Sequence, residues 1–241
     1  MLRTITRNPA RIFHWLATSV AILALVAVFA ETEPVNAQDT SARASIMQVS
    51  LDGPVGPASA DHIISAIDQA TESNSQLLII QLNTPGGLDA AMRNMVSEIL
   101  ASPVPVVTWV SPSGARAASA GTYILMASHV AAMSNATNVG SSTPVSAGGQ
   151  GEDLDDKIIN DAAAYLAGLA ELRGRNVDWA RQTVTDAANI NATEALQLGV
   201  IDLIADDQQQ LLAQLDGLNI ETEAGQVTLN TQDAAVETID T

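Results

Sequence analysis

The chain has 241 residues, a formal net charge of −17 and no cysteine. So acidic a sequence offers no basic stripe for phosphates, which argues against a nucleic-acid partner. Without cysteine, neither a disulfide framework nor a thiolate metal site can form. Aromatic residues make up 3% of the chain, so the core must consist of Ala, Val, Ile and Leu. The length is sufficient for one domain with a sizeable core and an appendage.

Residues 1–37 have the layout of a secretory signal peptide. Three arginines precede an apolar run at residues 15–30. Small residues follow this run, and we predict cleavage after Ala37, with Ala30 as the second choice. Because the apolar run is long for a signal peptide, an uncleaved N-terminal anchor is the alternative. Either form predicts that the rest of the chain is secreted across the inner membrane and is extracytoplasmic (periplasmic) and membrane-associated.

From residue 44 onward, short apolar runs alternate with longer amphipathic segments. In chain order we predict a strand at 45–51, a helix at 57–72, a strand at 76–82, a helix at 88–101, a strand at 104–110, a short helix at 115–128, a strand at 130–133, helices at 157–172 and 178–185, and a helix followed by a strand within 191–205. The repeated β–α order favours a parallel α/β core.

Two segments depart from this alternation. Residues 134–156 are rich in Ser, Gly, Asn and Asp and are too long for an ordinary connection, so they predict a functional lid or a disordered segment. Residues 207–241 are expected to form a C-terminal tail, with a helix at 207–215, a weak hairpin at 219–230 and an acidic end.

The stretch "PSGARAASAGTYI" (112–124) contains the first candidate for catalysis, Ser119. Alanine and glycine surround this serine, and small residues of this kind are typical of a tight packing contact. The same small side chains would also let a substrate backbone approach a nucleophilic hydroxyl. The stretch by itself therefore leaves packing and catalysis both open.

The candidates for a base are two histidines and one lysine. Neither His62 nor His129 lies in a motif typical of a base, and we expect a surface position for His62 and a structural role for His129. Lys157 is the only lysine in the sequence, whereas the other basic side chains are arginines. A desolvated lysine can lose its proton and act as a general base, which arginine almost never does. Chance rarity of lysine is the competing interpretation.

Acidic residues surround this lysine in the sequence, within the run at 153–161. Carboxylates favour the charged form of a nearby amine, which is the wrong direction for a base. Lys157 would therefore have to turn away from them into an apolar pocket. The acidic run lacks the pattern of a calcium loop, so we expect solvated charge and no metal there.

The motif "NTPGGL" (83–88) follows a predicted buried strand and precedes a helix. Two glycines at such a junction let the backbone approach a ligand and direct free N–H groups at it. These donors can stabilise an oxyanion or hold a phosphate. A strand-to-helix turn often requires glycine in any case, so the motif by itself is weak.

Five motifs together resemble the NfeD-type membrane-bound serine proteases, relatives of the Clp protease subunit and of signal peptide peptidase A. They occur in order between residues 44 and 230: "LNTPGGL", "PSGARAASAGTYI", "NATNVGSSTPV", "KIINDAAAYLAGLAELRGRN" and "NATEALQLGVIDLIA". The resemblance implies an α/β, ClpP/crotonase-like spiral of ββα units, with a protease domain at 44–206. Full-length members continue into membrane-spanning helices and a small β-barrel domain, for which this sequence shows no counterpart.

The resemblance also implies a Ser–Lys dyad, with Ser119 as nucleophile and Lys157 as base. The N–H groups of Gly87 and Ala120 would form the oxyanion hole, with Gly86 as a further candidate donor. Clp-type relatives place a histidine after the nucleophile, where this chain reads "SSTPVS", and this departure leaves lysine as the base. No cofactor and no metal are implied.

The function expected from the resemblance is an extracytoplasmic serine endopeptidase that cleaves apolar segments of membrane-associated proteins. Its expected partners are peptide or membrane-protein substrates of stomatin- or prohibitin-like type, and further copies of itself in a dimer or higher homo-oligomer. One alternative is a ClpP-like scaffold in membrane-protein assembly without hydrolysis. A crotonase-type acyl-CoA enzyme is the other, and the poverty of basic residues for the CoA phosphates argues against it.

Overall fold

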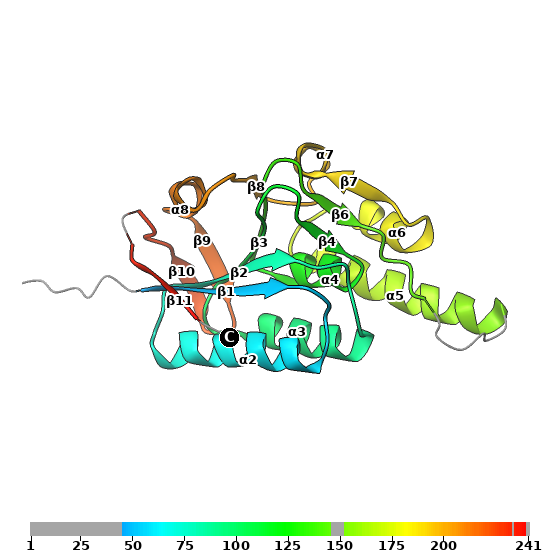
Figure 1. Ribbon diagram of the computed structural model, residues 1–241, viewed down its shortest axis with the longest axis horizontal. Helices are drawn as coiled ribbons and strands as arrows, with labels where there is room; N and C mark the ends of the chain where they lie inside the picture. Colours follow the sequence, from blue (N-terminus) through cyan, green and yellow to red (C-terminus); the bar gives the residue numbers. More distant parts are fainter. Residues whose placement is uncertain (1–44, 146–151, 233, 240–241) are drawn as a thin grey trace, which may run out of the picture. The chain divides into compact units, whose positions relative to one another are not determined.

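The computed structural model describes residues 45–145, 152–232 and 234–239 (Figure 1). The signal peptide or anchor predicted for residues 1–37 lies outside these residues. Six strands form a sheet in the order β11-β1-β2-β3-β5-β8, and every neighbouring pair is parallel. Their bounds are β1 (Ile46–Asp52), β2 (Leu77–Asn83), β3 (Val106–Val110), β5 (Val130–Met133), β8 (Leu203–Ile204) and β11 (Val236–Thr238).

The six-stranded sheet is covered on both faces. In β2, Leu78 and Ile80 pack into the core cluster that includes Ile63 of α2 (Pro57–Glu72) and Met95 of α3 (Asp89–Ala101). The intervening Ile79 points to the opposite cluster. Figure 1 shows α2 and α3 side by side along one face. A strand buried on both sides needs apolar residues at every position, which explains the continuous run at 76–82.

The C-terminal residues cover the other face. Leu211 and Leu215 of α8 (Gln208–Leu215) and Leu229, which follows the hairpin, pack against β2 and β3 in the second cluster. The hairpin consists of β9 (Asn219–Thr222) and β10 (Gly225–Thr228), which pair antiparallel. Strand β11 then joins the sheet beside β1. Residues 208–239 therefore complete the core of the same domain.

A smaller sheet contains β4 (Arg116–Ala118), β6 (Asn138–Gly140) and β7 (Asn189–Asn191). Strands β4 and β6 are parallel, and β7 is antiparallel to β6. Twice along the chain, a strand of the six-stranded sheet is followed by a strand of the three-stranded sheet and then by a helix. These units are β3–β4–α4, with α4 at Ala120–Ala127, and β5–β6–α5, with α5 at Glu152–Leu172. Helices α6 (Val177–Thr185) and α7 (Ala192–Gln197) flank β7.

Two sequence predictions were wrong in their bounds. The helix predicted over 115–128 begins only at Ala120, because residues 116–118 pair with β6 and form strand β4. Ladder hydrogen bonds here outweigh the helical preference of alanine. The predicted loop at 134–156 contains strand β6, and α5 already begins at Glu152.

No helix within residues 45–145, 152–232 and 234–239 combines the length and hydropathy that a membrane crossing requires.

Candidate active site

Ser119 stands at the turn between β4 and α4 in an unusual backbone conformation. Its φ is 53° and its ψ is −117°, a positive φ that residues other than glycine rarely adopt. The turn is fixed by two hydrogen bonds: the Ser119 N–H donates to the Gly140 carbonyl at 3.0 Å, and the Ser119 carbonyl accepts from the Thr122 N–H at 2.9 Å. Backbone strain of this kind is concentrated at functional sites.

The Ser119 hydroxyl is partly buried and has no hydrogen-bond partner among the described residues. A serine at the N-cap of a helix usually accepts a hydrogen bond from the second or third helical N–H. Here the backbone conformation of Ser119 turns its side chain away from that role. The hydroxyl is consequently left available to a reacting group.

The glycine loop after β2 lies directly against this serine. A Cβ added to Gly86, whose φ is +105°, would lie 2.6 Å from the Ser119 Cβ and 3.1 Å from its Oγ. A Cβ added to Gly87 would lie 2.0 Å from the carbonyl oxygen of Val55, with which Gly87 forms a parallel bridge. Both positions therefore require glycine. The "PGG" motif therefore lies against Ser119, although Ser119 follows Gly87 by 32 positions in the sequence.

The backbone N–H groups around Ser119 differ in whether they already donate a hydrogen bond. The Gly86 N–H donates to the Thr84 hydroxyl at 3.1 Å. The N–H groups of Gly87 and Ala120 make no hydrogen bond to any described residue. Ala120 is the first residue of α4, so its N–H belongs to the beginning of a helix, whereas Gly87 lies in the loop two residues before α3. Gly87 and Ala120 thus offer two free donors, whereas Gly86 is already engaged.

Lys157 lies on α5, and its side chain is exposed. In the described part of the chain it makes no ion pair and no hydrogen bond, and none joins it to Ser119. Helix α5 nevertheless packs against α4, because the Tyr123 hydroxyl donates to the Ala162 carbonyl at 3.2 Å. Lys157 precedes Ala162 by five residues, which is about 7.5 Å along a helix axis. The structure therefore packs α4 and α5 together without a hydrogen bond between the Ser119 and Lys157 side chains.

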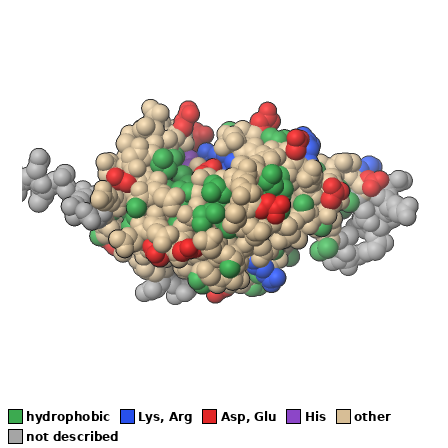
Figure 2. All heavy atoms as spheres, turned by 90° about the horizontal axis from the view of Figure 1, so that it is seen from above, with side chains coloured by type: hydrophobic (Ala, Val, Ile, Leu, Met, Phe, Trp, Pro, Cys, Tyr) green, Lys and Arg blue, Asp and Glu red, His purple; other side chains and the backbone are tan. Residues whose placement is uncertain are grey.

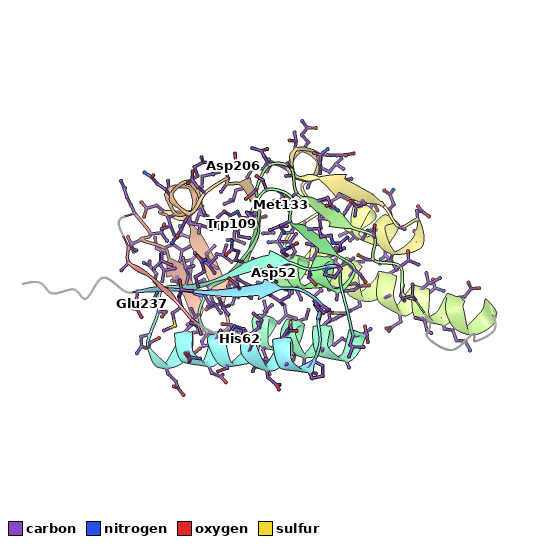
Figure 3. All side chains as sticks on the ribbon, viewed as in Figure 1. Asp52, His62, Trp109, Met133, Asp206 and Glu237 are labelled. Carbon is purple, nitrogen blue, oxygen red and sulfur yellow. The ribbon has the colours of Figure 1, made fainter. Side chains whose placement is uncertain are left out.

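The two histidines take no part in this arrangement. His62 lies on α2 (Figure 3). His129 follows α4, and its Nδ1 accepts the Val106 N–H at 3.1 Å. Burial, aided by the nearby guanidinium groups of Arg173 and Arg175, lowers the pKa of His129 to about 3. The expected structural role of His129 is confirmed by this hydrogen bond, which needs a neutral ring.

The described residues contain no group of three or more His, Asp or Glu side chains that could hold a metal ion.

Sequence comparison assigns the chain to a family. The family model described as "NfeD1b, N-terminal domain" matches residues 45–239, which is nearly all of the described structure. The chain belongs to this family.

Two curated relatives match this NfeD-family chain. "Membrane-bound protease PH1510" of Pyrococcus horikoshii is 40% identical over 166 residues, which are 67% of this chain and 38% of that protein. "Membrane protein NfeD1b" of Bacillus subtilis is 27% identical over 170 residues, again 38% of the relative. The chain therefore matches well under half the length of either curated relative.

Solved structures confirm the ClpP-like α/β fold. A serine-to-alanine mutant of the 1510-N membrane-bound stomatin-specific protease superposes with a TM-score of 0.77 at 33% identity, covering 83% of this chain and 99% of that one. A lysine-to-alanine mutant of the same protease, in complex with a substrate peptide, gives a TM-score of 0.77 at 34% identity, covering 83% of this chain and 94% of that one.

Sequence reasoning missed two residues that shape this region. Thr84 holds the Gly86 N–H from a fully buried position, and its place directly before "PGG" was the available signal. Arg93 on α3 contacts the helix that carries Lys157, since it forms an ion pair with Asp161 at 2.6 Å. Nothing in the sequence indicated this contact, because it joins residues 68 positions apart.

Proposed function

We propose that this NfeD-family domain is a serine endopeptidase with Ser119 as nucleophile and Lys157 as general base. One observation carries the proposal: Ser119 is held in a strained turn, with an unpartnered hydroxyl, directly against the Gly86–Gly87 loop. The free N–H groups of Gly87 and Ala120 support an oxyanion hole at this place. The solved relatives, a protease in serine-to-alanine and lysine-to-alanine forms, support the same pair of residue types.

In the proposed reaction, neutral Lys157 accepts the proton of the Ser119 hydroxyl as the serine oxygen attacks the scissile carbonyl. The carbonyl oxygen becomes an oxyanion, which the N–H groups of Gly87 and Ala120 stabilise. Collapse of the tetrahedral intermediate expels the amine, which receives the proton from Lys157. Water then hydrolyses the acyl-enzyme by the same steps. Helix α5 must bring Lys157 to Ser119 in the substrate complex, since catalytic contacts are often longer without substrate.

We propose apolar segments of membrane-associated proteins as the substrates. Leu88, which follows Gly87, is 59% exposed, and Ile158, which follows Lys157, is 40% exposed. Both offer apolar surface next to proposed catalytic groups. Figure 2 shows hydrophobic side chains at the surface among acidic ones on the face seen from above. The solved relatives are described as specific for stomatin, which supports a stomatin- or prohibitin-like partner for this chain.

We also propose an extracytoplasmic, membrane-associated location and assembly into a dimer or higher homo-oligomer. The layout of residues 1–37 supports the location, and the curated relatives are named as membrane proteins. Fractionation of cells and light scattering of the purified chain test these two statements.

The test of the activity is cleavage of an apolar peptide by the full 241-residue chain between about pH 6 and pH 10, followed by mass spectrometry. Ser119→Ala and Lys157→Ala should each lower kcat/KM by at least about 1000-fold with folding intact. Ser113→Ala, in the exposed loop before β4, and Arg181→Ala, an exposed cation on α6, are matched controls. Cleavage that survives Lys157→Ala rejects the dyad. No cleavage by the unmodified chain supports the non-hydrolytic scaffold instead.

A further inference from the structure

Arg93 joins three side chains into one cluster between α3 and α5. Its guanidinium forms ion pairs with Asp89 at 2.9 Å and with Asp161 at 2.6 Å, and it lies 4.4 Å from the centroid of the Tyr165 ring. Tyr165 in turn stacks on Tyr123 of α4, with 5.8 Å between ring centroids. The cluster thus connects α3, the helix that follows the glycine loop, with α5 and α4.

Asp161 follows Lys157 by four residues on α5. Residues at this spacing are neighbours on the surface of a helix, so the Asp161 carboxylate can reach the Lys157 ammonium. Such a pair would favour the charged form of the lysine. In the structure the Asp161 carboxylate is instead bound by Arg93, and no ion pair joins it to Lys157 among the described residues.

We propose that Arg93 is a positioning residue for the Ser–Lys dyad, because it withholds the Asp161 carboxylate from Lys157 and holds α5 against α3. The inference rests on the proposed function, in which Lys157 must be neutral to accept the serine proton. Surface ion pairs add little to stability, and the Arg93 and Asp161 side chains are 37% and 70% exposed. We therefore ascribe the three contacts of Arg93 to an electrostatic effect on Lys157 and not to a contribution to folding stability.

Other charged and titratable groups also lie on the elements packed around α5. They are Asp89 and Glu98 on α3, Tyr123 on α4, Asp178, Arg181 and Asp186 on or next to α6, and Glu152, Asp153, Asp155, Asp156, Tyr165 and Glu171 on α5 itself. Asp156 is adjacent to Lys157 in sequence and Asp153 precedes it by four residues. All of these groups are unchanged in the variants below, so they affect every variant alike.

Because Lys157 is the only lysine, its side-chain signal can be followed without signals from other lysines. The full chain is dimethylated with carbon-13-labelled formaldehyde, and the lysine NMR signal is followed against pH. Lys157→Arg identifies that signal and separates it from the terminal amine. We expect Arg93→Gln to raise the titration midpoint by about 0.3–1 pH unit, because Asp161 becomes free to pair with the ammonium. Arg93→Gln combined with Asp161→Asn should reverse most of this rise, and Arg181→Gln should leave the midpoint unchanged.

The unmethylated variants give the second readout. The ascending limb of kcat/KM against pH should move to higher pH in Arg93→Gln by the same amount and return in the double variant. A purely structural role predicts loss of activity at every pH, no shift of the limb and no recovery in the double variant. An unchanged NMR midpoint in Arg93→Gln overturns the inference. Because that midpoint needs no turnover, it decides the inference separately from the protease activity itself.

Discussion

Gly86 lies so close to Ser119 that a Cβ on the glycine would be 2.6 Å from the Cβ of the serine. The N–H of Gly86 is bound by Thr84 and its carbonyl accepts the Val55 N–H at 2.9 Å, so its peptide groups are held on both sides. The loop can therefore not move aside for a larger residue at this position. The proposed nucleophile and the proposed oxyanion hole depend on this one contact.

Gly86→Ala is expected to lower kcat/KM by about 100-fold or more, because the new methyl group displaces either the Ser119 side chain or the Gly87 N–H. Alanine at a φ of +105° adds backbone strain of about 1–3 kcal/mol. Peptide cleavage and thermal unfolding of the same preparation measure the two effects.

Gly114→Ala is the matched control for this substitution. Gly114 also has a positive φ, +91°, but a Cβ there would meet nothing within 4 Å. Its alanine variant should show a comparable loss of stability and near-native cleavage. Equal losses of activity in both variants would mean that strain, and not the contact with Ser119, explains the effect.

Residue type alone did not decide the candidate site, because glycine also serves ordinary turns and small residues also serve packing. "PGG" and the serine in "AASAG" became site candidates through the resemblance of five motifs in order to the NfeD-type proteases. The sheet was predicted because β2 and β3 are apolar at nearly every position. A strand that is buried on both faces needs apolar residues at nearly every position, so it appears in the sequence as a continuous apolar run.

The structural features that could not be predicted are formed by residues that lie far apart in the sequence. Strand β4 is alanine-rich, and its pairing with residues 138–140, together with the bridge between Ala117 and Thr84, makes it a strand. The contact of Arg93 with Asp161 has no local signature. The free N–H groups of Gly87 and Ala120 could be expected, but the engagement of Gly86 by Thr84 required the structure.

Thr84→Val tests whether the Gly86 peptide group must be held. The Thr84 methyl is tightly packed, since a Cβ on Gly121 would lie 2.5 Å from it, and valine keeps this shape. Loss of the hydroxyl leaves the Gly86 N–H without its partner, which should lower stability by about 1–2 kcal/mol and lower kcat more than it raises KM. Thr183→Val, also fully buried and bonded to the Ala188 carbonyl, should lower stability equally and leave kcat unchanged.

We expect Arg175 to stabilise the C-terminal end of α4. It is 6% exposed, and its guanidinium donates to the carbonyls of Met126 at 2.9 Å and Ser128 at 3.0 Å and pairs with Asp202 at 2.6 Å. Arg175→Met should lower the free energy of unfolding by about 3 kcal/mol, because acceptors at the helix C-terminus and the carboxylate lose their partner. A fall in Tm of roughly 6–12 °C is expected by calorimetry. Arg181→Met, at an exposed position of α6, should change Tm by less than about 1 °C.

His129 should make the fold sensitive to acid. Its pKa is lowered by burial, and by Arg173 and Arg175, from the ordinary 6.5 to about 3 in the folded chain. The unfolded chain therefore binds more protons between these two values, so the stability contributed by the neutral ring is complete above pH 6.5 and is lost as the pH falls toward 3. Between pH 7 and pH 5 this loss amounts to about 2 kcal/mol.

The comparison of His129→Asn with the unmodified chain isolates this effect. Asparagine can still accept the Val106 N–H but cannot become charged. Chemical denaturation at pH 7 and pH 5 should give a fall in stability that is about 2 kcal/mol smaller in the variant. His62→Asn on α2 serves as the control and should behave like the unmodified chain. If His129→Asn loses as much stability as the unmodified chain between these pH values, the carboxylates, and not this ring, govern the acid sensitivity.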